Sequence, residues 1–158
     1  MPFIALAIGV IIAIVDQIFK ILVATHLKPV GTVNVFGDVF KLTYVENRGV
    51  AFGMFKDMPW LFIVITAGLL AAIIIYMFKK RPESKFFYIT VALIIGGGLG
   101  NLIDRIIYGY VIDYLSLSFF PPVCNFADYC ITVGVILFAV YLLFLSDTFD
   151  SKKVKKHD

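Results

Sequence analysis

Four long apolar stretches dominate the pattern of hydrophobic and polar positions along the chain. They cover about residues 3–25, 59–78, 86–103 and 126–145. A helix needs roughly 20 mostly apolar residues to cross the hydrocarbon core of a bilayer, and each stretch is close to that length. The pattern therefore predicts an all-α membrane protein, a four-transmembrane-helix bundle that forms a single domain over residues 1–158.

Lysine and arginine are concentrated in two short flanks of these stretches. The loop 79–85 holds four basic residues, and four lysines follow residue 151. Basic residues in short loops face the cytoplasm, so we expect both segments, and hence the N- and C-termini, to be cytoplasmic. The first stretch lacks a basic leader and is too long for the apolar region of a cleaved signal, which favours a retained helix. The segments 26–58 and 104–125 then lie outside.

The outer segment 26–58 carries a pattern typical of strands. Thr32–Phe36 and Val39–Val45 are rich in β-branched and aromatic residues, and Gly37-Asp38 between them is a turn signal. We expect a small β-sheet cradle within 26–58, resting on the outer membrane surface.

Composition narrows the class of protein. Hydrophobic residues make up 61% of the chain and charged residues 16%, whereas soluble domains have about 25% charged residues. There is no basic stripe for nucleic acid. Cys124 and Cys130 show neither a CxxC nor a metal-type spacing, so we expect two free, half-buried thiols, and no metal or cofactor. We also expect a monomer.

Polar residues in or beside the spans gather toward the outer side, and such residues are functional hypotheses by default. Asp16 and Lys20 are four residues apart and can pair on one helix face. Asn101 lies three and four residues before Asp104 and Arg105, on one face. These groups also have structural interpretations, since a buried pair can fix helix packing and an asparagine can join two helices.

Small and capping residues add to this picture. The glycines between Gly96 and Gly100 indicate a close-packing surface rather than a ligand loop. Asn125 and Asp128 open the last span, where both residue types are common helix caps. Asp113 has no basic neighbour in sequence and apolar residues on both sides, so its carboxyl group needs a partner or a proton.

The pair Asp113 and Asp128 supplies both. Two carboxylates that lie together do not easily both ionise, so the pair holds one proton near neutral pH. The ionised group takes a proton from water and the protonated one polarises a peptide carbonyl, which is general acid–base hydrolysis. The chain has no HExxH or GxSxG motif. A pairing of His26 with Ser116 or Ser118 is left open, but nothing in the sequence marks it.

Two other classes of protein compete with a peptidase. A small membrane transporter or proton channel also carries intramembrane carboxylates, but here they cluster at one end and no internal repeat is apparent. A non-catalytic scaffold explains the glycines and gives no reason for two aspartates near one surface.

Five blocks of residues, in order along nearly the whole chain, resemble the bacterial lipoprotein signal peptidase family, signal peptidase II. The blocks are Asp16–Lys20, Asn47–Gly53, Gly96–Arg105, Val111–Tyr114 and Asn125–Asp128. Each block is weak alone, and the order of all five is specific.

The resemblance implies an aspartic endopeptidase of the bacterial cytoplasmic (inner) membrane, with its active site toward the outer face. It implies cleavage of lipid-modified prolipoproteins before the diacylglyceryl-modified cysteine, with membrane lipid as the surroundings. The catalytic aspartates of the family fall on Asp113 and Asp128. Its other polar positions, with roles in substrate binding or site architecture, fall on Asp16, Lys20, Asn47, Asn101, Asp104, Arg105 and Asn125.

Three positions depart from the family pattern. Phe19 stands where Ser or Thr is frequent, Gly98 where Ala is common, and Cys124 where Phe usually precedes the asparagine. None removes a catalytic group, and the change at Cys124 affects packing beside the expected site.

Overall fold

The computed structural model describes residues 1–49 and 58–145, and these contain four helices long and apolar enough to cross a membrane. They are α1 (Pro2–Leu22), α2 (Pro59–Lys80), α3 (Lys85–Tyr108) and α4 (Phe126–Val140). Single π-helical turns extend two of them, η1 (Val23–Leu27) after α1 and η3 (Tyr141–Leu145) after α4. The prediction of four spans is confirmed, although α3 continues five residues beyond the expected end at 103.

Local sequence explains where the helices begin and end. Pro59 occupies the first turn of α2, where its missing N–H costs nothing. Ser84 caps α3, since its hydroxyl accepts a hydrogen bond of 3.3 Å from the backbone N–H of Phe87. Gly109 ends α3 at φ +75°, a conformation that glycine adopts without strain.

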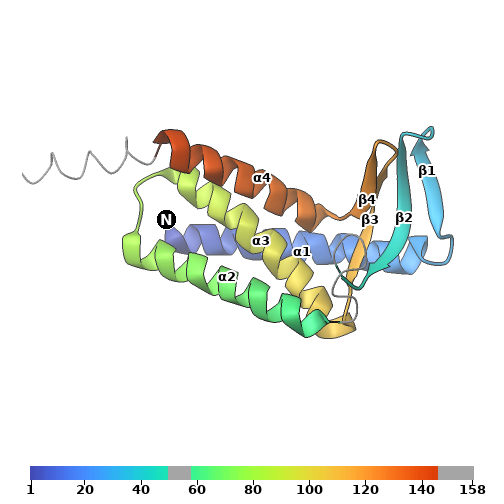
Figure 1. Ribbon diagram of the computed structural model, residues 1–158, viewed down its shortest axis with the longest axis horizontal. Helices are drawn as coiled ribbons and strands as arrows, with labels where there is room; N and C mark the ends of the chain where they lie inside the picture. Colours follow the sequence, from blue (N-terminus) through green and yellow to red (C-terminus); the bar gives the residue numbers. More distant parts are fainter. Residues whose placement is uncertain (50–57, 146–158) are drawn as a thin grey trace, which may run out of the picture.

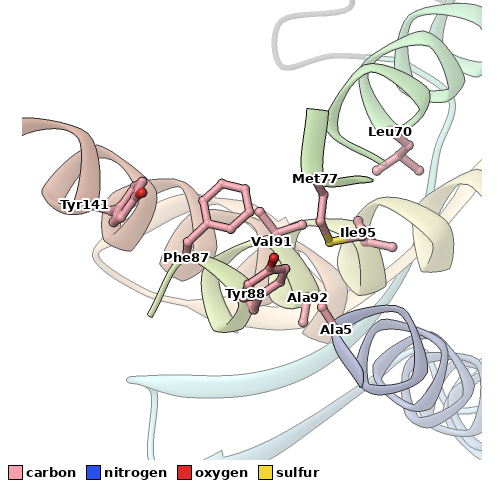
Figure 2. Packing of buried hydrophobic residues seen from close by; sticks show 9 residues of the cluster. All are labelled: Ala5, Leu70, Met77, Phe87, Tyr88, Val91, Ala92, Ile95 and Tyr141. Carbon is pink, nitrogen blue, oxygen red and sulfur yellow. The ribbon is translucent and has the colours of Figure 1, made fainter. Parts of the chain in front are cut away.

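Helix α3 is the centre of the bundle and packs against α1, α2 and α4. Its glycines allow the close approach, because a side chain at Gly97 would overlap the backbone of Ala127 on α4 and one at Gly100 would overlap Asp16 on α1. The predicted close-packing surface is therefore confirmed. Near the start of α3, Figure 2 shows a buried cluster in which Phe87 lies between Tyr141 and Val91.

A four-stranded antiparallel sheet of order β1-β2-β3-β4 stands at one end of the bundle, and the N-terminus and the α2–α3 turn lie at the other (Figure 1). The strands are β1 (Thr32–Phe36), β2 (Phe40–Asn47), β3 (Val111–Leu117) and β4 (Phe120–Cys124). The first hairpin was predicted, and Gly37 in its turn has a φ of +51°.

The expectation that the sheet lies within 26–58 was incomplete, because the segment between α3 and α4 supplies its other half. No strand was predicted in this segment, yet β3 pairs with β2 from Val111 to Leu117. The proline pair in β4 is compatible with an edge strand, where a missing N–H breaks no ladder bond. From its place in the sequence after the third span, Asp113 was expected at the outer end of that span; this was wrong, because Asp113 lies on strand β3.

Candidate functional site

The polar residues predicted from the sequence meet where the sheet joins the helices. The ends of α1 and α3 nearest the sheet, the first turn of α4 and the strands β2 and β3 contribute to this junction (Figure 1). Most of its charged and amide side chains are almost fully buried. They are Asp16, Lys20, Asn101, Asp104, Asp113 and Asn125.

Asp113 is buried on β3 and holds two amide donors. The Nδ2 of Asn47, on the neighbouring strand β2, donates to its Oδ2 at 2.9 Å, and the Nδ2 of Asn125 donates to its Oδ1 at 2.6 Å. Burial raises the pKa of Asp113 to about 7, and the negative charge of Asp128 adds to the rise. The two amide bonds oppose it, since they stabilise the ionised form.

Asp128 is the third residue of α4 and is only half-buried. Its Oδ2 accepts from the backbone N–H of Asn125 at 3.0 Å, and its own N–H donates to Asn125 Oδ1 at 2.9 Å. This reciprocal pair is a capping box, so the capping interpretation of both residues is correct. It is also incomplete, because Asn101 Nδ2 donates to the other carboxylate oxygen of Asp128 at 2.8 Å.

Asn125 joins the two aspartates. Its side chain donates to Asp113, receives the N–H of Asp128 and also donates to Asn101 Oδ1 at 3.1 Å. All its polar atoms are therefore used, and its position fixes both carboxyl groups relative to α3.

Lys20 forms the base of the junction. Its Nζ lies 2.8 Å from Asp16 Oδ2, 3.0 Å from Asp104 Oδ2 and 2.9 Å from Asn101 Oδ1, with 1% of the side chain exposed. The predicted Asp16–Lys20 pair is confirmed, and Asp104 is a second carboxylate that the sequence did not assign to it.

The same two aspartates tie the helices to the elements around them. Asp16 Oδ1 on α1 accepts from the backbone N–H of Ala127 on α4 at 3.0 Å. Asp104 Oδ2 accepts from the backbone N–H of Ile112 at 3.0 Å, at the start of β3. The buried charges thus hold both the helix that carries Asp128 and the strand that carries Asp113.

Gln17 belongs to the junction and was not among the predicted site residues. Its Nε2 donates to Asp104 Oδ1 at 2.9 Å and to the carbonyl of Gly100 at 3.1 Å. The sequence offered a signal, because an amide beside Asp16 in an apolar span needs a partner.

Arg105 lies at the edge of the junction. Its Nη1 donates to the carbonyl of Asn101 at 3.3 Å, and its guanidinium carbon lies 5.2 Å from the ring centroid of Phe62 on α2. The Oδ1 of Asn47 accepts a hydrogen bond of 3.1 Å from the backbone N–H of Gly49. Residues 50–53 of the same sequence block lie outside the described residues.

The remaining candidates lie apart from this junction. His26 is exposed and bonds the carbonyl of Leu22 at 3.0 Å, and no hydrogen bond to Ser116 or Ser118 is present in the described part of the chain. Cys124 and Cys130 are free thiols, as expected, but Cys130 is buried rather than half-buried because it faces Gly97 on α3. Within residues 1–49 and 58–145, no three His, Cys, Asp or Glu side chains converge as a metal ion needs.

Two hollows lie along the helices, and the smaller one is bounded by Asp128. An apolar groove of about 750 Å³ runs along α3 between α2 and α4, and its lining includes Leu70, Ile94 and Ile131. A smaller cavity of about 290 Å³ is bounded by Phe120, Cys124 and Asp128 itself. Asp128 is thus accessible from a predominantly apolar side.

Comparisons with known proteins identify the family of this chain. The family model described as Signal peptidase (SPase) II matches residues 8–144. The chain is 44% identical to a lipoprotein signal peptidase of Caldanaerobacter subterraneus subsp. tengcongensis, over 89% of this chain and 96% of that protein. It is 40% identical to a lipoprotein signal peptidase of Clostridium acetobutylicum, over 96% and 99% respectively.

Two solved structures, both described as bacterial membrane enzyme structures, share the fold. One has a TM-score of 0.81 at 30% identity, covering 89% of this chain and 93% of the other, and the second has a TM-score of 0.80 at 31% identity, covering 92% and 90%. The family model, the relatives and the shared fold lead to one conclusion: this chain is a multi-pass membrane protein that belongs to the signal peptidase II family of peptidases.

Proposed function

We propose that this chain is an aspartic endopeptidase that removes signal peptides from prolipoproteins by cleaving before the diacylglyceryl-modified cysteine. The observation that carries the proposal is the link between Asp113 and Asp128 through Asn125. A raised pKa for one carboxyl group of such a pair is what general acid–base hydrolysis needs, and the pKa of Asp113 is about 7.

In this mechanism Asp113 carries the shared proton and Asp128 is ionised. Asp128 takes a proton from water, whose oxygen attacks the scissile carbonyl carbon, while Asp113 gives its proton to the carbonyl oxygen. The resulting diol collapses when Asp128 passes its proton to the leaving nitrogen and the C–N bond breaks. Asp113 regains a proton from the diol as the new carboxylic acid forms.

The apolar groove along α3 suits the signal peptide. Its volume of about 750 Å³ and lining of Leu70, Ile94 and Val135 offer a surface for an apolar helix that stays in lipid. Ile131 in its wall lies one helical turn beyond Asp128. A peptide that leaves the groove toward the sheet therefore arrives at the aspartates.

The other predicted polar residues have supporting roles in this proposal. Asn47, Asn101 and Asn125 hold the aspartates by hydrogen bonds, and Asp16, Lys20 and Asp104 form the buried base. Arg105 is the cation available to substrate beside them. The proposed setting is the bacterial cytoplasmic membrane, with cytoplasmic termini, the site toward the outer face and a monomeric chain.

The test is cleavage of a lipidated precursor by purified protein in detergent. Asp113→Asn and Asp128→Asn are expected to fold and to lose cleavage by at least roughly 10²-fold, the lower range of general acid–base catalysis. A precursor without the diacylglyceryl group serves as the substrate control. Near wild-type cleavage by Asp128→Asn would contradict the dyad, because asparagine caps a helix about as well as aspartate.

The transporter alternative gains no support from the comparisons, since the relatives described above carry peptidase names. Among the described residues, the buried charged side chains all belong to the junction at the sheet end of the bundle: Asp16, Lys20, Asp104 and Asp113.

A further inference from the structure

A polar cavity of about 360 Å³ lies beside the junction and is not part of the proposed dyad. The outer end of α1, the turn η1, the end of α3 and the strands β2 and β3 enclose it. Its lining comprises Gln17, Lys20, Ile21, Ala24, Thr25, Lys28, Tyr44, Tyr108, Tyr110 and Ile112. This volume lies within the range of small-ligand sites, about 300–1,000 Å³.

The sheet separates this cavity from the aspartates. Side chains alternate between the two faces of a strand, and on β2 Tyr44 and Glu46 alternate with Asn47, which contacts Asp113. One strand therefore carries both a residue of the cavity and a residue of the proposed active site.

Beside the cavity lining, at Glu46, two cations lie against one carboxylate, while the lining residue Lys20 is paired within the junction. Lys28 Nζ lies 3.1 Å from Glu46 Oε1, and Arg48 Nη2 lies 3.2 Å from Glu46 Oε2. Two cations thus share one carboxylate, and half of the Lys28 side chain is exposed. The pKa of Glu46 is lowered, first by its bond with Lys28, so it is ionised at neutral pH and one positive charge is left over.

Three tyrosines, Tyr44, Tyr108 and Tyr110, contribute phenol groups to the polar part of the cavity lining. Tyr44 OH donates to Glu46 Oε1 at 3.2 Å, and the ammonium group of Lys28 lies 5.1 Å from the Tyr44 ring centroid. Tyr108 and Tyr110 stack with their centroids 5.8 Å apart, and Arg48 lies 5.2 Å from the Tyr110 ring. Tyrosines at the ends of spans mark the headgroup level of a bilayer.

The cavity lining also has apolar groups. Ile21 on α1, which is 58% exposed, and Ala24 on η1 lie beside Gln17 and Thr25 on the helix side. The cavity is therefore amphipathic, with hydroxyl and ammonium donors next to aliphatic groups. A small soluble anion would contact only the polar donors of such a site, whereas a lipid would also contact the aliphatic groups.

We propose that this cavity binds the headgroup of an anionic phospholipid of the outer leaflet. The phosphate lies at Lys28 and the phenol groups, where hydroxyl and ammonium donors are the partners that phosphate oxygens take. The glycerol and the first acyl carbons lie along Ile21 and Ala24. A zwitterionic lipid binds less well, because its ammonium group meets the surplus positive charge of Lys28 and Arg48.

The test measures lipid binding and needs no peptidase activity, so it stands or falls separately from the proposed function. Purified protein is placed in nanodiscs of phosphatidylcholine with increasing phosphatidylglycerol, and lipid retained after transfer to detergent is counted by native mass spectrometry. We expect one retained phosphatidylglycerol. Lys28→Gln is expected to weaken its binding about fivefold, the effect of about 1 kcal/mol for one cation near a membrane surface, and Lys28→Arg to restore it.

The chain offers a matched control in Lys41, which is also on the sheet and pairs with Asp38 at 3.1 Å. Lys41→Gln is expected to leave phosphatidylglycerol retention unchanged. An equal loss with Lys41→Gln and Lys28→Gln, or no loss with Lys28→Gln, would overturn the proposal. If Lys28→Gln fails to fold, Tyr110→Phe removes one hydroxyl and must also lower retention. Saturation by glycerol phosphate without lipid would reassign the cavity to small phosphates.

Discussion

The side-chain amide of Asn125 lies 2.6 Å from Asp113 Oδ1, while its carbonyl oxygen caps the helix that carries Asp128. One side chain thus performs a structural task and a positioning task, and the two can be separated by substitution.

Asn125→Ser is expected to keep the fold and to lose cleavage. Serine caps a helix about as well as asparagine, so the thermal unfolding temperature should change little. Its hydroxyl is too short to reach Asp113, and cleavage of the lipidated precursor should fall at least tenfold. Asn125→Ala removes the cap as well, at a cost of about 1 kcal/mol. Full activity in Asn125→Ser would show that the bond to Asp113 is not needed.

The rate of cleavage should fall as pH rises through about 7. Burial and the charge of Asp128 raise the pKa of Asp113 to about 7, so below this pH the carboxyl group carries its proton and above it the proton is lost. The hydrogen bond from Asn47 lowers this pKa, and Asn47→Ala should therefore move the alkaline limb to higher pH. Asn34→Ala, at an exposed position on β1, is the control. A shift to lower pH in Asn47→Ala would contradict the assignment.

Asp16 and Lys20 should behave as one unit in a double-mutant cycle. Breaking a buried ion pair costs roughly 3–5 kcal/mol, because one charge is left without a partner. Lys20→Met should lower folded yield more than Asp16→Asn, since Lys20 also pairs with Asp104 at 3.0 Å. The double variant should lose less than the sum of the two, measured as the change in unfolding free energy. Strict additivity would count against direct coupling.

Gly98→Ala and Gly100→Ala should differ sharply in stability. A side chain on Gly100 would overlap the carboxylate of Asp16 and displace the buried pair. A side chain on Gly98 meets only the flexible end of Leu70, at 2.9 Å, which can rotate away. We expect folded yield to collapse in Gly100→Ala and to remain near wild type in Gly98→Ala. Comparable yields of the two variants would argue against the close approach of α1 and α3.

The membrane orientation is testable by cysteine labelling of whole cells in a background without Cys124 and Cys130. Glu83→Cys, on the exposed turn between α2 and α3, should react only after the cells are permeabilised. Asp38→Cys, whose side-chain position is 90% exposed at the tip of the sheet, should react in intact cells. Ser84 is unsuitable because it is buried and caps α3. Labelling of Glu83→Cys in intact cells would contradict the predicted orientation and indicate that this turn faces outside.

The sequence predicted those parts of the fold that depend on local spacing. The four spans follow from length and polarity, and the Asp16–Lys20 pair follows from a separation of four residues on a helix. The first hairpin was marked by Gly37 in its turn. In each case the interacting groups are near neighbours in the chain, so their spacing in the sequence is enough to predict the contact.

Contacts between distant segments could not be obtained in this way. The hydrogen bond between Asn47 and Asp113 depends on the register of β2 against β3, and these residues are 66 positions apart. Val111–Leu117 has β-branched and aromatic residues typical of a strand, but the sequence does not indicate which strand it pairs with or in which register. Asn125 was understood as a cap, and its second partner became visible only when β3 was placed beside α4.

The bond from the backbone of Ala127 to Asp16 spans 111 residues and has a consequence for biogenesis. Translation delivers Asp16 with the first span, and the residues that complete the dyad arrive only with the last. A nascent chain with three spans in the bilayer has Lys20 and Asp104 in place but lacks both Asn125 and Asp128. If the proposed dyad performs the cleavage, the newly made protein is inert toward neighbouring precursors until its final helix has inserted beside the first.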